Sequence, residues 1–144
     1  MKEGIREIAD SVRPDMVRLA GAWIGLAAAW FAGLPPIAQA LLLTQGADVI
    51  TGLLCAIKGK SSKTASGKVS SGALVMGMLK KGLEWLVVLI CVYVGAALDM
   101  QGISGAAMTY MIATELVSLT ENLSVFGLNI PLLDKLLDVA QKGL

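Results

Sequence analysis

The sequence predicts an all-α integral membrane protein with about four transmembrane helices and a short amphipathic helix at each end. Of its 144 residues, 56% are hydrophobic and 16% are charged, with a mean hydropathy of +0.72. Soluble domains are only about 45–50% apolar. The apolar residues form long runs, and all twelve lysines and arginines lie in an N-terminal arm, a central loop or a C-terminal tail. Both observations indicate a single multi-pass membrane domain over residues 1–144.

The first two predicted membrane helices span residues 15–32 and 36–57. Between Arg18 and Lys58 lie 39 residues whose only charge is Asp48. At about 1.5 Å per residue, this stretch is too long for one crossing of a hydrocarbon core of about 30 Å. The sequence "GLPP" at residues 33–36 divides it, because proline disfavours helical geometry in the residue before it. Four acidic residues among the first fifteen argue against a cleaved signal peptide here.

The second pair of predicted helices covers residues 82–98 and 103–126, joined by a tight turn at "DMQG". The loop at residues 58–81 contains six lysines and no acidic residue. We expect this loop to be flexible and attracted to anionic headgroups. Since lysine and arginine favour the cytoplasmic side, four crossings place the loop and both termini there, N-in and C-in.

The two terminal arms, residues 3–13 and 131–144, carry apolar residues at helical spacing. Each is predicted to be a short amphipathic helix on the inner leaflet. Packing against another subunit or against the basic loop is the alternative interpretation.

The composition excludes several classes of function. A net charge of +1 and the lack of basic runs interleaved with aromatic residues argue against nucleic-acid binding. Histidine is absent, and Cys55 and Cys91 lack metal-ligand spacing. No nucleophile elbow or phosphate-binding loop occurs. We therefore expect no enzymatic activity, no metal and no cofactor.

Two acidic residues fall inside predicted membrane helices. Asp48 and Glu115 each lie twelve residues after the start of their helices, so their side chains are expected at similar depth. No basic partner is predicted at that depth, so the acids must be hydrogen-bonded, hydrated or protonated. Polar or small residues share their helix faces, and the candidates for a helix seam or a pore lining are Asp48, Thr51, Gly52, Glu115, Ser118, Asn122 and the flanking Glu121. Glu84, beside Lys80 and Lys81, is expected to form an ion pair at headgroup level.

Three stretches resemble the phage holins associated with toxin secretion and phage lysis. They are "ADVITGLLCAIKGK" at residues 47–60, "LKKGLEWLVVLI" at 79–90 and "ATELVSLTENLSVFGLNIPLLDKLL" at 113–137. The shared pattern combines Asp48 and Gly52 with Glu115, Ser118, Glu121, Asn122, Gly127 and Pro131. The resemblance implies a homo-oligomer in the bacterial cytoplasmic membrane that opens lesions and releases an endolysin or a secreted toxin.

Two other functions remain open from the sequence. Asp48 and Glu115 could form the relay of a small proton or cation channel or transporter, although no internal repeat supports this. Alternatively, the chain could be a non-conducting regulator, an antiholin, that binds a true holin. Under the holin hypothesis, both acids are neutral or hydrogen-bonded in the closed state and ionise or become hydrated when the membrane depolarises.

Overall fold

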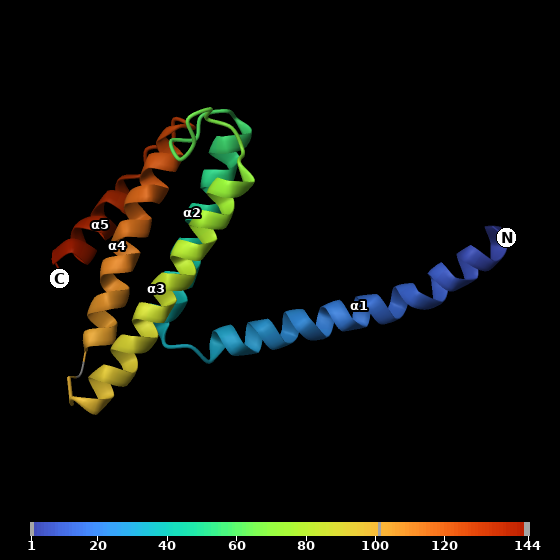
Figure 1. Cartoon of the computed structure of the whole chain (residues 1–144), viewed down its shortest axis with the longest axis horizontal. Helices are drawn as coiled ribbons and strands as arrows, with labels where there is room; N and C mark the ends of the chain where they lie inside the picture. Colours follow the sequence, from blue (N-terminus) through green and yellow to red (C-terminus); the bar gives the residue numbers. More distant parts are fainter. Residues whose placement is uncertain (1, 101, 143–144) are drawn as a thin grey trace. The chain divides into compact units, whose positions relative to one another are not determined.

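The computed structural model describes residues 2–100 and 102–142, and Figure 1 shows its five helices. Helix α1 covers Lys2–Ala32, α2 Pro36–Ile57, α3 Ser71–Ala97, α4 Ile103–Ser124 and α5 Pro131–Lys142. No strand occurs within these ranges. The predicted all-α class is therefore confirmed.

Helix α1 belongs to a separate unit, residues 1–35. The sequence predicted an arm at 3–13 and a second helix at 15–32, but one continuous helix passes through Pro14. A proline removes one N–H donor and its ring crowds the carbonyl four residues before it, which can bend a long helix without ending it. The side chains of residues 16–30 are exposed within the unit, including Trp23 and Trp30. Such an apolar surface requires lipid or another protein surface around it.

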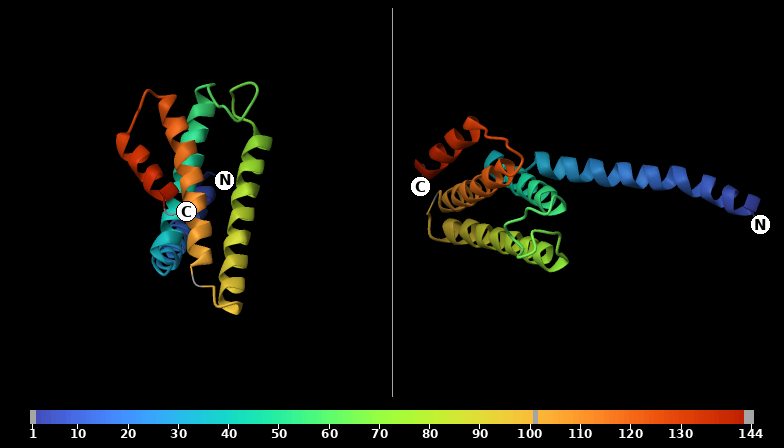
Figure 2. Two further views of the ribbon diagram at one scale, coloured as in Figure 1. Left: turned by 90° about the vertical axis from the view of Figure 1, so that its left-hand side faces the viewer. Right: turned by 90° about the horizontal axis from the view of Figure 1, so that it is seen from above.

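The second unit comprises residues 36–144 and is organised around α4, which packs against α2, α3 and α5. Figure 2 shows α2 and α4 side by side, with α3 running in the opposite direction. The thiol of Cys55, near the end of α2, donates a hydrogen bond of 3.3 Å to the backbone oxygen of Asn122, near the end of α4. The two helices are therefore parallel, as the sequence predicted.

The boundaries of α2 agree with the prediction, and α4 ends two residues earlier than expected. Helix α3, however, starts at Ser71 instead of residue 82. The Ser70 hydroxyl caps it by accepting a hydrogen bond of 3.4 Å from the backbone N–H of Ala73. The lysines at positions 80 and 81 suggested a loop, but the apolar residues between the cap and Lys80 continue the helix.

The connecting loop is consequently residues 58–70, and it has a defined path. Gly59 and Gly67 adopt left-handed backbone conformations, each with φ of 70°. The N–H of Ser61 donates to the backbone oxygen of Gly67 at 3.0 Å, and a Cβ on Gly67 would overlap the carbonyl of Gly59. Glycine is therefore required at position 67 to fold the loop back over the helices.

The second unit has an apolar exterior and polar residues inside. Large apolar side chains of α3 such as Leu83, Leu89 and Ile90 are more than half exposed, whereas four polar residues are buried: Gln45, Asp48, Glu115 and Asn122. Among the described residues, α2 is the one helix long and apolar enough by composition to cross a membrane, and Met16–Ala32 is a shorter apolar segment. Of the charged residues within α3 and α4, Lys81, Glu84 and Glu115 lie on the inner side considered next, whereas Lys80 and Glu121 are exposed.

Candidate functional site

The polar residues of α2, α3 and α4 meet in a buried network centred on Asp48, which we call the polar seam. Asp48 is only 3% exposed. Its Oδ1 accepts hydrogen bonds from the Ser118 hydroxyl at 2.6 Å and from the Asn122 amide at 3.0 Å. Both donors belong to α4, where they are four residues apart and share one face. The acid predicted on α2 and the polar stripe predicted on α4 therefore contact each other directly.

Lys81 joins the two buried carboxylates. Its ammonium lies 3.2 Å from Asp48 Oδ2 and 2.6 Å from both carboxylate oxygens of Glu115. Lys63, from the loop, donates to both oxygens of Asp48 at 3.3 and 3.2 Å. The prediction that neither acid has a basic partner at its depth was therefore wrong.

The reason is the early start of α3 and the course of the loop. Since α3 begins at Ser71, Lys81 lies ten residues inside a helix that packs on α4. Its side chain is 14% exposed, whereas that of Lys63 is 52% exposed. Two carboxylates and two ammonium groups thus balance formally, and a balanced, hydrogen-bonded set is the form in which charges are tolerated away from water.

A second layer of the seam surrounds Gln45, one helical turn before Asp48. The Gln45 amide donates to Glu84 Oε2 at 2.8 Å, and its carbonyl accepts from the Trp85 indole at 2.9 Å. Glu84 therefore faces the interior, besides a longer contact of 3.9 Å with the exposed Lys80. The ion pair expected for Glu84 is therefore present with Lys80, and the hydrogen bond from Gln45 is an additional contact that the sequence did not predict. Gln45 was missed, although its spacing of three residues from Asp48 places it on the same helix face.

Comparison with known proteins identifies the family. The model of the bacteriophage holin family matches residues 25–142, which include the whole seam. The chain belongs to this family. A probable holin of Bacillus phage phi105 is 30% identical over 107 residues, 74% of either chain. No solved structure matches the chain significantly. The resemblance noted in the sequence is confirmed, and this holin is a phage-type membrane protein associated with lysis.

Of the remaining candidate residues, Thr51 and Gly52 lie at the polar seam and Glu121 does not. Thr51 accepts a hydrogen bond of 3.1 Å from the Asn122 amide and lies in the seam. Gly52 lies beside it, where a Cβ would be 3.6 Å from the Asn122 amide nitrogen and 3.8 Å from the Lys63 ammonium. Glu121 is exposed and lies outside the seam. The structure thus brings together every predicted candidate except Glu121.

The interactions of the seam are hydrogen bonds and ion pairs between side chains of different segments. Within residues 2–100 and 102–142, no buried side-chain nitrogen or oxygen lacks a hydrogen-bond partner. The carboxylates of Asp48 and Glu115 accept hydrogen bonds from the ammonium groups of Lys63 and Lys81. These paired charges connect α2, α3 and α4. Because most of these bonds join α2, α3 and α4 to one another, separating the helices breaks several of them at once.

Proposed function

We propose that this holin crosses the bacterial inner membrane four times, oligomerises there and opens lesions. The lesions dissipate the membrane potential and let an endolysin or another protein cargo leave the cytoplasm. The observation that carries this proposal is the polar seam, a charged network enclosed by helices whose outer surfaces are apolar. In the closed subunit such helices can present apolar surfaces to lipid. Their polar faces can contact neighbouring subunits when the helices separate.

The dimensions of the helices support four crossings. At 1.5 Å per residue, α2 and α4 are each about 33 Å long and α3 about 40 Å, against a hydrocarbon core of about 30 Å. The apolar part of α1, Met16–Ala32, is about 26 Å long. The loop at residues 58–70 and the two end segments carry ten of the twelve lysines and arginines, which favours a cytoplasmic position for all three, and the other two, Lys80 and Lys81, lie in the first half of α3.

The pairing within the seam favours a particular opening step. With Lys81 between them, Asp48 and Glu115 can be charged in the closed subunit without facing lipid. Opening then requires α3 to separate from α2 and α4, so that water or residues of neighbouring subunits replace these pairs. This step differs from the ionisation of neutral acids expected from the sequence. Each exposed polar face lowers the cost of exposing the next, so opening spreads cooperatively through an assembly.

The proposal is tested by expressing the holin in a bacterium at controlled membrane levels. A potential-sensitive dye should report an abrupt loss of membrane potential. Release of cytoplasmic β-galactosidase should follow when an endolysin is co-expressed. A channel or transporter would change the potential without releasing the enzyme, and an antiholin would do neither. Unchanged growth with an intact potential at high membrane levels would overturn the proposal.

A further inference from the structure

A cavity lies between α2 and α3, beneath the loop at residues 58–70. Its volume is about 290 Å³, and it opens on one side. The two helices both pack on α4 but have few close backbone contacts with each other. Long side chains bridge them instead, including Lys81 to Asp48 and Trp85 to Gln45. This separation leaves the space that the loop covers.

The walls of the cavity are apolar and its loop end is basic. Val49 and Leu53 of α2 face Leu74 and Met78 of α3 across it. The charged lining residues are three lysines and one acid: Lys63, Lys68, Lys81 and Asp48. Because Asp48 and Glu115 balance Lys63 and Lys81, the cavity combines a hydrophobic interior with one excess positive charge, that of Lys68.

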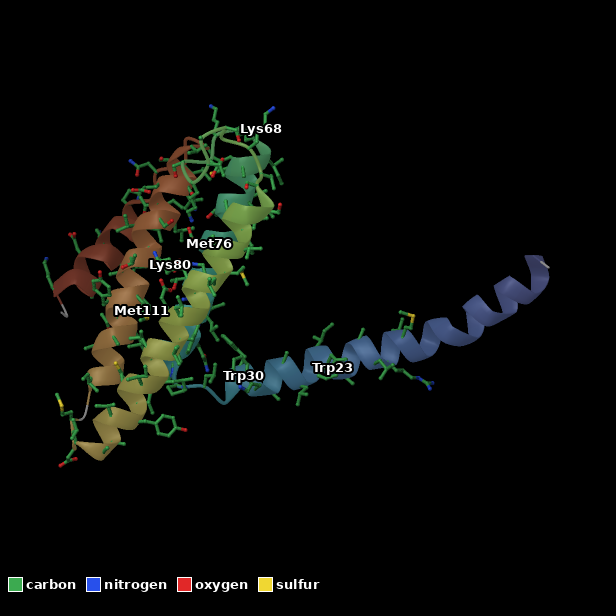
Figure 3. All side chains as sticks on the ribbon, viewed as in Figure 1. Trp23, Trp30, Lys68, Met76, Lys80 and Met111 are labelled. Carbon is green, nitrogen blue, oxygen red and sulfur yellow. The ribbon has the colours of Figure 1, made fainter. Side chains whose placement is uncertain are left out.

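Lys68 distinguishes this cavity from the polar seam. Lys63 and Lys81 both bind Asp48, whereas the Lys68 ammonium makes no ion pair with any other residue in the described ranges. Figure 3 shows Lys68 at the loop end of the unit. Ser70, which caps the N-terminus of α3, lines the same cavity. The partial positive charge of a helix N-terminus thus adds to that of an unpaired lysine.

We propose that this cavity binds one anionic phospholipid, with an acyl chain between α2 and α3 and the phosphate at Lys68 and the start of α3. The ligand must be amphiphilic and anionic, because the walls are apolar and the charge is positive. Basic pockets between membrane helices on the cytoplasmic side are suited to anionic headgroups. The site depends on the proposed orientation of the loop towards the inner leaflet, where such a lipid can enter from the side.

Native mass spectrometry of the full-length protein in detergent tests the site. Phosphatidylglycerol and phosphatidylcholine with identical acyl chains are titrated in parallel. One phosphatidylglycerol per chain should bind in clear preference to phosphatidylcholine. Lys68→Gln should weaken phosphatidylglycerol binding about fivefold, the effect of one lysine near an anionic surface. The matched control is Lys60→Gln, which removes the same charge from the same loop at a residue that does not line the cavity.

A second variant tests the apolar part of the site without changing charge. Ala73→Phe places a large side chain in the cavity from α3. It should abolish the binding of one phosphatidylglycerol per chain while the melting temperature stays close to that of the wild type. Equal binding of the two lipids, equal effects of Lys60→Gln and Lys68→Gln, or unchanged binding in Ala73→Phe would overturn the site. A second protein chain that displaces the lipid would also overturn it.

These outcomes are separable from those of the lysis assay. A protein that binds one phosphatidylglycerol in detergent but never depolarises cells retains the lipid site and loses the proposed function. A protein that depolarises cells but binds the two lipids equally retains the proposed function and loses the lipid site.

Discussion

The substitution Lys81→Gln removes the charge that the two buried carboxylates share. Lys81 lies 3.2 Å from Asp48 Oδ2 and 2.6 Å from Glu115, and its side chain is 14% exposed. Removing one partner of a buried ion pair costs about 3–5 kcal/mol, because a charge is left without compensation. Asp48 keeps Lys63 as a partner, but Glu115 has no other ion pair among the described residues. The loss of stability should therefore come mainly from Glu115.

The assay is thermal unfolding of the purified protein in detergent. For a chain of this size, each kcal/mol corresponds to roughly 2–4 °C in melting temperature, so Lys81→Gln should lower it by roughly 6–20 °C. The matched control is Lys80→Gln at the neighbouring residue. Lys80 is 70% exposed and lies 3.9 Å from Glu84, a pair worth less than about 1 kcal/mol. Equal melting temperatures for the two variants would refute the reasoning.

A double variant separates lost charge pairing from lost packing. Combining Lys81→Met with Glu115→Gln removes both the cation and the carboxylate that it leaves behind. Replacing a whole buried pair is often close to neutral, so the double variant should recover more than half of the lost stability. A loss as large as that of Lys81→Gln would mean that the uncompensated charge of Glu115 is not the cause of the lower stability.

Three further predictions concern residues at different positions around the seam. Glu121→Gln should change lysis timing and melting temperature very little, since Glu121 is exposed, and a shift as large as that of Glu115→Gln would contradict its placement. Asp48→Asn should bring lysis forward at equal amounts of protein in the membrane, because it weakens the contacts of Lys63 and Lys81. Unchanged timing would mean that the seam packs the helices and has no role in opening. Gly67→Ala should lower the melting temperature more than Gly59→Ala, because both positions have φ of 70° but only position 67 would place a Cβ against a backbone carbonyl.

The sequence predicted α2 and α4 correctly because clear end signals precede both, whereas Pro14 does not end α1. Pro36 starts α2, and the turn before Ile103 starts α4, so both were placed correctly. The start of α3 has no such signal apart from Ser70, one of several serines in a small-residue loop. The sequence prediction there depends on charge, because Lys80 and Lys81 indicate a loop that ends after them.

The same error determined which site residues were missed. Helical spacing was sufficient to place Asp48, Ser118 and Asn122 on facing stripes, because this spacing does not depend on the ends of the helices. Lys81 was missed because it had been assigned to the loop. Lys63 could not have been placed from the sequence, since its position depends on the glycine turns that fold the loop back over α2.

The arrangement of the seam links stability in the closed state to the proposed opening. Its ion pairs connect α3 and the loop to a pair of helices, α2 and α4, that also contact each other through Cys55 and Asn122. Helices α2 and α4 share the most extensive close packing, α3 packs less extensively on α4, and α2 and α3 meet mainly through long polar side chains. Hydrogen bonds between side chains can be exchanged for hydrogen bonds to water at a modest net cost in free energy. Helix α3 is therefore the element expected to move when subunits open a lesion, while α2 and α4 stay together.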